Sequence, residues 1–210
     1  MTHSVSASSR GTAGLNSASE PSAPAWSNGL ASAPDDLLAI RAGEGDEEAF
    51  AILVRRHSSP LLALAFHTLG NLQDAEDAVQ DAFISAWRRL PEFRHASAFS
   101  TWMYRITVNR CLNLLRAQPT PVPLNSVPEP TAAGIGSSPA RAAEHDALSD
   151  ALAGALSALE PQQRICWILR ELHGLRYAQI AHVTGTTEQT VRGRLFRARR
   201  TLKEALGTWR

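Results

Sequence analysis

The sequence predicts an all-α protein made of two small helical units joined by a flexible linker. Two observations support this fold class. Apolar residues recur at helical spacing in both halves of the 210-residue chain, with no strand alternation and no hairpin dipeptides. Two segments rich in small residues and proline interrupt that periodicity, at residues 1–34 and 118–146. With 44% hydrophobic residues, the chain can bury one or two modest cores.

The first interruption is an N-terminal arm, residues 1–34, which we expect to be disordered. It holds nine Ser, seven Ala, three Gly and three Pro, and its only charged side chains are Arg10 and Glu20. Such a composition cannot bury enough apolar area to offset the entropy lost on ordering. The first folded unit is therefore expected over residues 35–117.

An acidic helix is predicted within this first unit, in the stretch NLQDAEDAVQDAFISAWRRLPEF. Its buried stripe is expected at Ala75, Val79, Ala82, Ala86 and Leu90. On the opposite face Ile84 lies among charged residues, namely Asp74, Asp77, Asp81 and Arg88. An apolar centre with a polar rim is typical of a docking surface, although the spacing alone also fits a solvated acidic face.

The next stretch, FRHASAFSTWMYRITVNRCLNLLR, mixes aromatic and basic residues. From position 88 to position 116 there are six arginines and a single acidic residue, Glu92. This mixture fits a surface for single-stranded nucleic acid, where bases stack on aromatic rings and the backbone runs over arginines. The aromatics could equally belong to the core, and the spacing of Trp102 from Ile106 favours a core position for Trp102.

The second interruption, residues 118–146, is predicted to be a linker because it holds six prolines. The second unit, residues 147–210, contains the stretch GLRYAQIAHVTGTTEQTV, which has the layout of a helix-turn-helix. A short helix with Ile180 among its apolar residues ends at Gly185, and Thr186 is the expected cap of the next helix.

The last helix is basic. In TTEQTVRGRLFRARRTL five arginines fall within nine residues, and no acidic residue occurs from Gln189 to Lys203. The segment from Gln162 to Arg210 has ten Lys or Arg against three Glu, so its net charge is +7, whereas the net charge of the whole chain is +1. We therefore expect duplex DNA as its partner, with Arg192 and Phe196 facing base edges. Its buried stripe is expected at Val191, Leu195, Ala198 and Leu202.

Other functional classes lack support in the sequence. Cys111 and Cys166 lie far apart without metal-ligand spacing, which predicts no disulfide, no metal and no cofactor. No nucleophile with a base and no pair of carboxylates suggests catalysis, so we expect the protein not to be an enzyme. A secretory leader and an apolar run of about 18 residues are both missing, which favours the cytoplasm and argues against membrane insertion.

The order of these stretches closely resembles that of the extracytoplasmic-function sigma factors of bacterial RNA polymerase. The resemblance covers about residues 35–117 and 147–206. It implies a region 2 helical bundle in the first unit and a region 4 helix-turn-helix in the second. It also implies as partners promoter DNA, the clamp helices of the largest polymerase subunit, the flap of the second-largest subunit, and an anti-sigma factor of the kind many members possess.

Individual roles follow only from this resemblance. The polymerase-docking positions would be Asp77, Gln80, Asp81, Ile84 and Arg88. The −10 strand would contact Phe93, Arg94, His95, Ala96, Ser97, Ala98, Arg105 and Asn109. The −35 element would contact Gln189, Arg192, Gly193, Arg194, Phe196, Arg197, Arg199 and Arg200. Many members have glycine in place of Gln189, and glutamine can hydrogen-bond adenine, so we expect the base preference of this chain at the −35 element to differ from theirs.

Two alternatives fit parts of the pattern. A dimeric helix-turn-helix repressor would bind palindromic duplex without polymerase, and a helical adaptor would hold only protein partners. Co-purification with core polymerase would separate both from a sigma factor.

Overall fold

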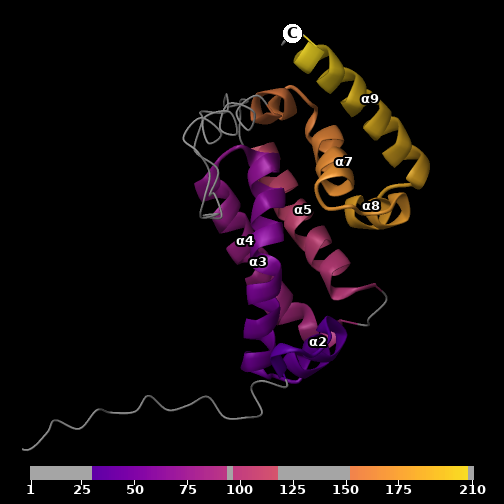
Figure 1. Cartoon of the computed structure of the whole chain (residues 1–210). Coiled ribbons are helices and arrows are strands. Elements are labelled where there is room, and N and C mark those ends of the chain that lie inside the picture. Colours follow the sequence, from indigo (N-terminus) through magenta and orange to yellow (C-terminus); the bar gives the residue numbers. More distant parts are fainter. Residues whose placement is uncertain (1–29, 94–96, 118–151, 208–210) are drawn as a thin grey trace, which may run out of the picture.

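The computed structural model describes residues 30–93, 97–117 and 152–207, and every regular element in these ranges is helical. The first unit holds α2 (Asp35–Gly43), α3 (Glu47–Leu69), α4 (Leu72–Arg89), a 3₁₀ turn (Leu90–Glu92) and α5 (Phe99–Ala117). The second unit holds a short helix at residues 152–157, then α7 (Pro161–Glu171), α8 (Tyr177–Thr184) and α9 (Glu188–Gly207). The predicted linker, residues 118–146, lies outside the described ranges (Figure 1).

Local sequence explains the α3–α4 hairpin. Asp46 caps α3 by accepting a 3.0 Å hydrogen bond from the Ala49 amide. Gly70 ends α3 in the left-handed conformation with φ 75°, a geometry that glycine adopts without strain. Asn71 then caps α4 by accepting from the Asp74 amide at 3.0 Å. The chain therefore reverses within two residues and lays α4 along α3.

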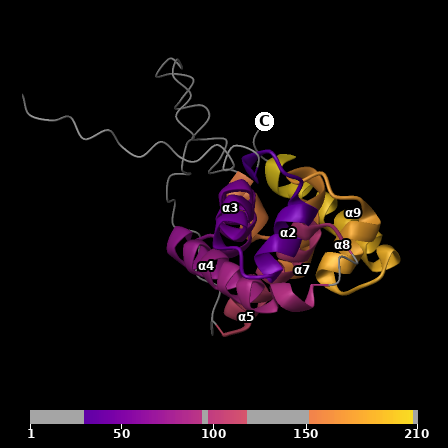
Figure 2. The same cartoon turned by 90° about the horizontal axis from the view of Figure 1, so that it is seen from below.

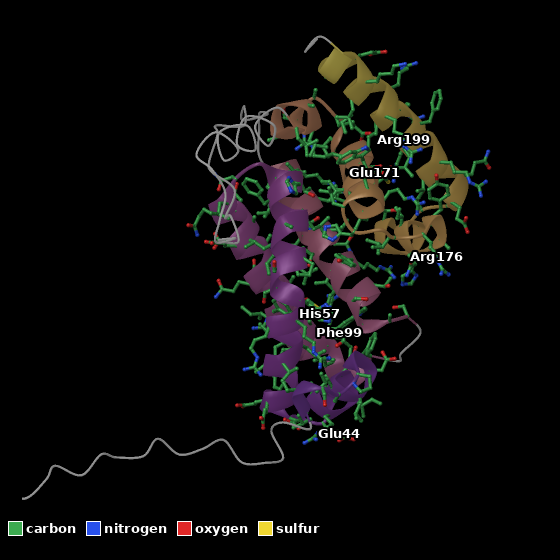
Figure 3. The ribbon with its side chains drawn as sticks, viewed as in Figure 1. Glu44, His57, Phe99, Glu171, Arg176 and Arg199 are labelled. Atoms are coloured by element: carbon green, nitrogen blue, oxygen red, sulfur yellow. The ribbon has the colours of Figure 1, made fainter. Side chains whose placement is uncertain are left out.

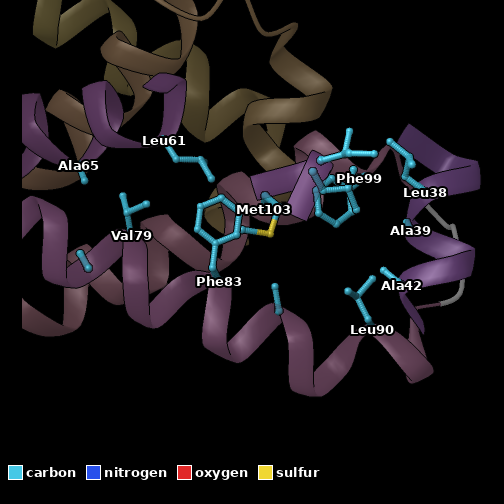
Figure 4. Close-up of a cluster of buried hydrophobic side chains, with 14 of the residues drawn as sticks. Leu38, Ala39, Ala42, Leu61, Ala65, Val79, Phe83, Leu90, Phe99 and Met103 are labelled. Carbon is cyan, nitrogen blue, oxygen red and sulfur yellow. The ribbon is translucent and has the colours of Figure 1, made fainter. Parts of the chain in front are cut away.

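The core of the first unit lies between α2, α3, α4 and α5 (Figure 4). The predicted stripe of α4 is buried as expected, since Ala75 and Ala86 are fully covered and Leu90 is 3% exposed. Phe99 and Met103 of α5 are also fully buried and pack against the same cluster. Close packing of this kind holds the two faces of α4 in fixed positions.

The N-terminal arm ends earlier than predicted. Leu30 is only 5% exposed and belongs to the core of the first unit. Arg56 of α3 donates to the carbonyl oxygens of Ala31 at 2.6 Å and Ala33 at 2.7 Å. Residues 30–34 are therefore part of the fold, because the buried Leu30 and an arginine 23 and 25 positions after the carbonyls that it bonds hold them in place. Residues 1–29 lie outside the described ranges.

The two units pack against each other. α7 and α8 lie beside α3 and α5, and Figure 2 shows α8 and α9 gathered on one side of the α2–α5 bundle. Leu64 of α3 and Val108 of α5 share one buried cluster with Ile165, Leu169 and Ile180 of the second unit. The linker prediction left the relative placement of the units open, and this shared cluster defines it.

A buried guanidinium seals this inter-unit contact. Arg164 of α7 is 8% exposed and donates to the Thr68 carbonyl, in the last turn of α3, at 2.7 Å. It also donates to the carbonyls of Ser157 at 2.9 Å and Leu159 at 3.2 Å. The last carbonyls of a helix have no partner within it and carry partial negative charge. One arginine therefore caps the C-terminal ends of two helices from different units.

A histidine also takes part in the contact between the two units. The Tyr104 hydroxyl of α5 lies 3.0 Å from Nδ1 of His173, which follows α7. Burial, together with a smaller effect of the nearby His67, lowers the pKa of His173 to about 4. His173 is therefore neutral in the folded chain at neutral pH, where its ordinary pKa of about 6.5 also leaves most of it neutral when unfolded.

Acid is expected to weaken the fold through this histidine. Between about pH 6.5 and pH 4 the unfolded chain binds a proton at His173 that the folded chain does not, so stability should fall as pH falls through this window. Urea unfolding at pH 7 and pH 5 measures the loss. The loss should be smaller in His173→Asn, which cannot titrate, and an equal loss in both proteins would contradict the assignment.

Candidate nucleic-acid interface

The helix-turn-helix is formed by α8 and α9. Gly185 ends α8 in the left-handed conformation, with φ 63° and ψ 39°, as predicted. The predicted cap of α9 at Thr186 is wrong by one residue. The Thr186 amide closes α8 by donating to the Ala181 carbonyl at 2.9 Å, and Thr187 caps α9 by accepting from the Thr190 amide at 3.2 Å.

The two faces of α9 differ as the sequence predicts. Val191, Leu195, Ala198 and Leu202 are at most 5% exposed and pack toward the rest of the second unit. Phe196 is 68% exposed, the highest value for a large apolar side chain among the described residues. Five predicted DNA contacts surround it on the exposed face: Gln189, Arg192, Arg197, Arg199 and Arg200.

Several of these arginines have acidic partners that the sequence argument missed, because the glutamates lie outside the 189–203 window. Arg192 lies 3.7 Å from Glu188, and Arg200 lies 3.8 Å from Glu204. Arg199 donates a 2.8 Å hydrogen bond to Glu171 of α7, and this bond raises the pKa of the Arg199 guanidinium (Figure 3). Exposed pairs of this kind stabilise a fold by less than about 1 kcal/mol, so phosphates can replace the glutamates.

Arg194 differs from the other predicted phosphate contacts. Its side chain is partly buried and donates a hydrogen bond to Gln162 of α7. It also lies close enough to lower the pKa of the Cys166 thiol, although burial of that thiol has the larger, opposite effect. In this structure Arg194 therefore joins α9 to α7 and does not point outward. Gly193, the remaining predicted position, is half-buried beside it.

A groove of about 480 Å³ lies between α4 and α5, and two of the eight predicted −10 contacts line it. Arg105 and Asn109 line it and are exposed. We call it the α4–α5 groove. The groove is also lined by residues that the −10 assignment did not include: Ala82, Ser85, Arg89, Ile106, Arg110 and Asn113. Arg89 and Arg110 nevertheless belong to the basic stretch predicted to bind single-stranded nucleic acid.

An aromatic side chain that packs against two other rings lines this groove. Trp102 lines it, is half-buried, and lies 4.7 Å from the Phe93 ring, while Phe99 lies beneath both rings and is fully buried. The expectation of a core position for Trp102 is thus only half right, because one face packs and the other borders the groove. His57 supports Phe99 from α3 at 5.3 Å, and Figure 3 shows the two rings together.

The loop before α5 is only partly described. Arg94, His95 and Ala96 lie outside the described ranges, so their predicted contacts are untested. Ser97 is half-buried and Ala98 is exposed at the start of α5.

The third predicted surface is the outer edge of α4. Four of the predicted docking residues are exposed along this edge, and we call them the α4 ridge: Asp77, Gln80, Ile84 and Arg88. The side chain of Ile84 is 43% exposed. Asp81 differs, because its carboxylate pairs with Arg110 of α5 and lines the α4–α5 groove. On the other side of the ridge lies an apolar groove of about 790 Å³, to which α3 contributes Phe50, Val54 and Leu62.

The described ranges hold no group of three or more His, Cys, Asp or Glu that could bind a metal ion. Within the same ranges, no helix is both long enough and apolar enough to span a lipid bilayer.

Comparison with known proteins places both units in families. Residues 53–119 match the family model of Sigma-70 region 2, and residues 149–202 match that of Sigma-70, region 4. The RNA polymerase sigma-H factor of Pseudomonas aeruginosa is 36% identical over 180 residues, covering 82% of this chain and 93% of the relative. The ECF RNA polymerase sigma-E factor of Escherichia coli is 36% identical over 173 residues, covering 79% and 90%.

Two solved structures are similar in fold. CnrH, solved in complex with the cytosolic domain of CnrY, superposes with a TM-score of 0.64 at 28% identity, covering 83% of this chain and 97% of that one. The sigma factor RpoE from Bartonella quintana, solved in complex with the anti-sigma factor NepR, superposes with a TM-score of 0.60 at 26% identity, covering 77% and 98%.

Proposed function

Because this chain belongs to the extracytoplasmic-function family of RNA polymerase sigma factors, we propose that three of its surfaces divide the work of promoter-specific initiation. A sigma factor binds core polymerase and directs it to promoters. The single observation that carries the division is that three exposed and chemically distinct surfaces lie on one helical scaffold: the basic face of α9, the α4–α5 groove and the α4 ridge.

We assign the −35 element to α9. Arg192 and Phe196 are exposed on the helix that follows the turn, and this is the helix that enters the major groove in helix-turn-helix proteins. A guanidinium can bond guanine, and an apolar ring can contact a thymine methyl. Arg197, Arg199 and Arg200 flank these two residues and would contact phosphates.

We assign the unpaired −10 strand to the α4–α5 groove. Arginines along the groove suit a phosphate backbone, and the half-exposed Trp102 offers a ring on which a base can stack. The exposed amide of Asn109 can bond the edge of a base that has left the duplex stack. Phe93, Ser97, Ala98 and the three undescribed loop residues would complete this site.

We assign the clamp helices of the largest polymerase subunit to the α4 ridge. Ile84 provides an apolar centre and the neighbouring polar residues provide a rim, which is the usual composition of a protein interface. The region 4 unit would meet the flap of the second-largest subunit. An anti-sigma factor is a further proposed partner, since the similar RpoE structure contains one.

Promoter recognition by this chain requires binding alone, so we propose that it performs no catalysis of its own and works in the cytoplasm, where polymerase and promoter DNA are found. Residues 118–146 are the proposed linker. As a flexible coil they would span about 30 Å, and fully extended about 95 Å, which lets the two units reach separate promoter elements.

Asn109→Ala and Arg192→Ala test the two DNA assignments and serve as controls for each other. Asn109→Ala should leave the closed complex intact and reduce the permanganate-reactive bubble about tenfold, since its amide acts only after a base has flipped. Arg192→Ala should weaken duplex −35 binding about tenfold. An unchanged bubble in Asn109→Ala would remove the groove assignment, and failure of the wild-type chain to pull down core polymerase would remove the whole proposal.

A further inference from the structure

One ion pair connects the α4 ridge to the α4–α5 groove. The carboxylate of Asp81 contacts the guanidinium of Arg110, and both residues line the groove. On α4, Asp81 lies four residues after Asp77 and three before Ile84, so it borders the ridge on the groove side. The same carboxylate therefore lies next to the proposed polymerase surface and inside the proposed strand site.

The charges of the groove favour a polyanion, with one exception. Three arginines line it, Arg89, Arg105 and Arg110, against the single carboxylate of Asp81. A phosphate entering the groove would be attracted by the arginines and repelled by Asp81. While Asp81 holds Arg110, it also neutralises one of the three positive charges. Asp81 thus opposes strand binding in two ways.

The pair is exposed enough to exchange partners. The side chains of Arg110 and Asp81 are 43% and 44% exposed. Ion pairs at such positions contribute less than about 1 kcal/mol, and a guanidinium can bond a phosphate in the same two-pronged geometry that it uses for a carboxylate. A backbone phosphate can therefore replace Asp81 on Arg110 without disturbing the fold.

We propose that Arg110 contacts a backbone phosphate of the single strand in the α4–α5 groove, and that Asp81 is a positioning residue that restrains Arg110 until polymerase engages the α4 ridge. A cationic polymerase group that pairs with Asp81 frees Arg110, so polymerase docking increases the affinity of the groove for the strand. The inference rests on the proposed function and deepens it, because it links two of the three surfaces.

The first test replaces the arginine. With a fluorescent single-stranded −10 oligonucleotide and the full chain bound to core polymerase, Arg110→Gln should weaken binding about fivefold and reduce the salt slope by about 0.7, the loss of one phosphate contact. Arg110→Lys should restore part of the affinity. The matched control is Arg55→Gln, which removes an exposed charge from α3 outside the groove and should leave binding unchanged.

The second test replaces the carboxylate. In the free full-length chain, Asp81→Asn should strengthen oligonucleotide binding about threefold. This gain should become smaller when Arg110→Gln is also present, because part of the effect of Asp81 acts through Arg110 and only its direct repulsion of phosphate remains. Glu76→Gln removes the same charge from the other side of α4, beside the apolar groove, and should have no effect. With core polymerase bound, the gain from Asp81→Asn should fall below about twofold, since polymerase has already engaged the carboxylate.

The outcomes separate this inference from the proposed function. If Asn109→Ala weakens oligonucleotide binding and Arg110→Gln does not, the strand occupies the groove without contacting Arg110 and the inference is overturned. If Glu76→Gln strengthens binding as much as Asp81→Asn, net charge alone is responsible, which also overturns it. An equal gain with and without polymerase would refute the release step. If neither Asn109 nor Arg110 matters, the strand assignment of the groove fails as well.

Discussion

Replacing Ile84 by aspartate is expected to weaken binding to core RNA polymerase by at least about 30-fold. Ile84 is the exposed apolar centre of the α4 ridge, and burying a carboxylate there would leave a charge without a partner. Anisotropy titration of a labelled chain with core polymerase measures the effect. Affinity for duplex −35 DNA should stay the same, because α9 lies in the other unit.

The control for this substitution is Ile40→Asp. Ile40 is exposed to nearly the same degree, 46% against 43%, but lies on α2 and outside the ridge. It should therefore retain wild-type affinity for polymerase. Equal losses in the two variants would show that any exposed carboxylate is harmful, and a wild-type affinity in Ile84→Asp would place the polymerase surface elsewhere.

Replacing Arg164 by alanine should lower the free energy of unfolding by about 3 kcal/mol. Three carbonyl oxygens, those of Thr68, Ser157 and Leu159, lose a charged donor in a buried place. Hydrogen bonds to charged groups contribute about 1.5 to 3 kcal/mol, and buried groups left unpaired add a further cost. Urea unfolding followed by circular dichroism measures the loss.

Arg170→Gln is the graded comparison for this variant. Arg170 also lies on α7 but donates to one carbonyl, that of Leu175, at 2.9 Å. Its loss should cost about 1 kcal/mol. If Arg164→Ala lowers the free energy of unfolding no more than Arg170→Gln does, water must hydrogen-bond the three carbonyls in place of Arg164. The capping of two helix ends by Arg164 would then contribute little to stability.

The features that the sequence predicted well are those set by neighbours within one or two helical turns. The buried stripe of α9, the left-handed Gly185 and the exposed Phe196 all follow from local periodicity and backbone preference. Even the misplaced cap at Thr186 was a competition between adjacent residues, decided when its amide closed α8. Local rules determine such features because all the interacting atoms lie on the same short segment.

The features that escaped prediction depend on residues far apart in the chain. Arg164 caps a carbonyl 96 positions earlier, and no spacing in the sequence links it to Thr68. The pairing of Asp81 with Arg110 likewise arises only after α5 has packed against α4. Residues 30–34 looked like a continuation of the arm, because the partner that orders them, Arg56, lies on a later helix.

The contact between the two units has a consequence for the population of binding-competent molecules. Any promoter complex in which the units lie farther apart than here must first break the cluster that joins Leu64 and Val108 to α7 and α8. Only the molecules whose units have separated can then bind, and the apparent affinity falls in proportion to their fraction. Each additional 1.4 kcal/mol, roughly, that favours the packed arrangement lowers the apparent affinity tenfold. A substitution inside this contact, remote from both DNA and polymerase, would therefore change promoter occupancy by changing the fraction of molecules in which the two units are separated.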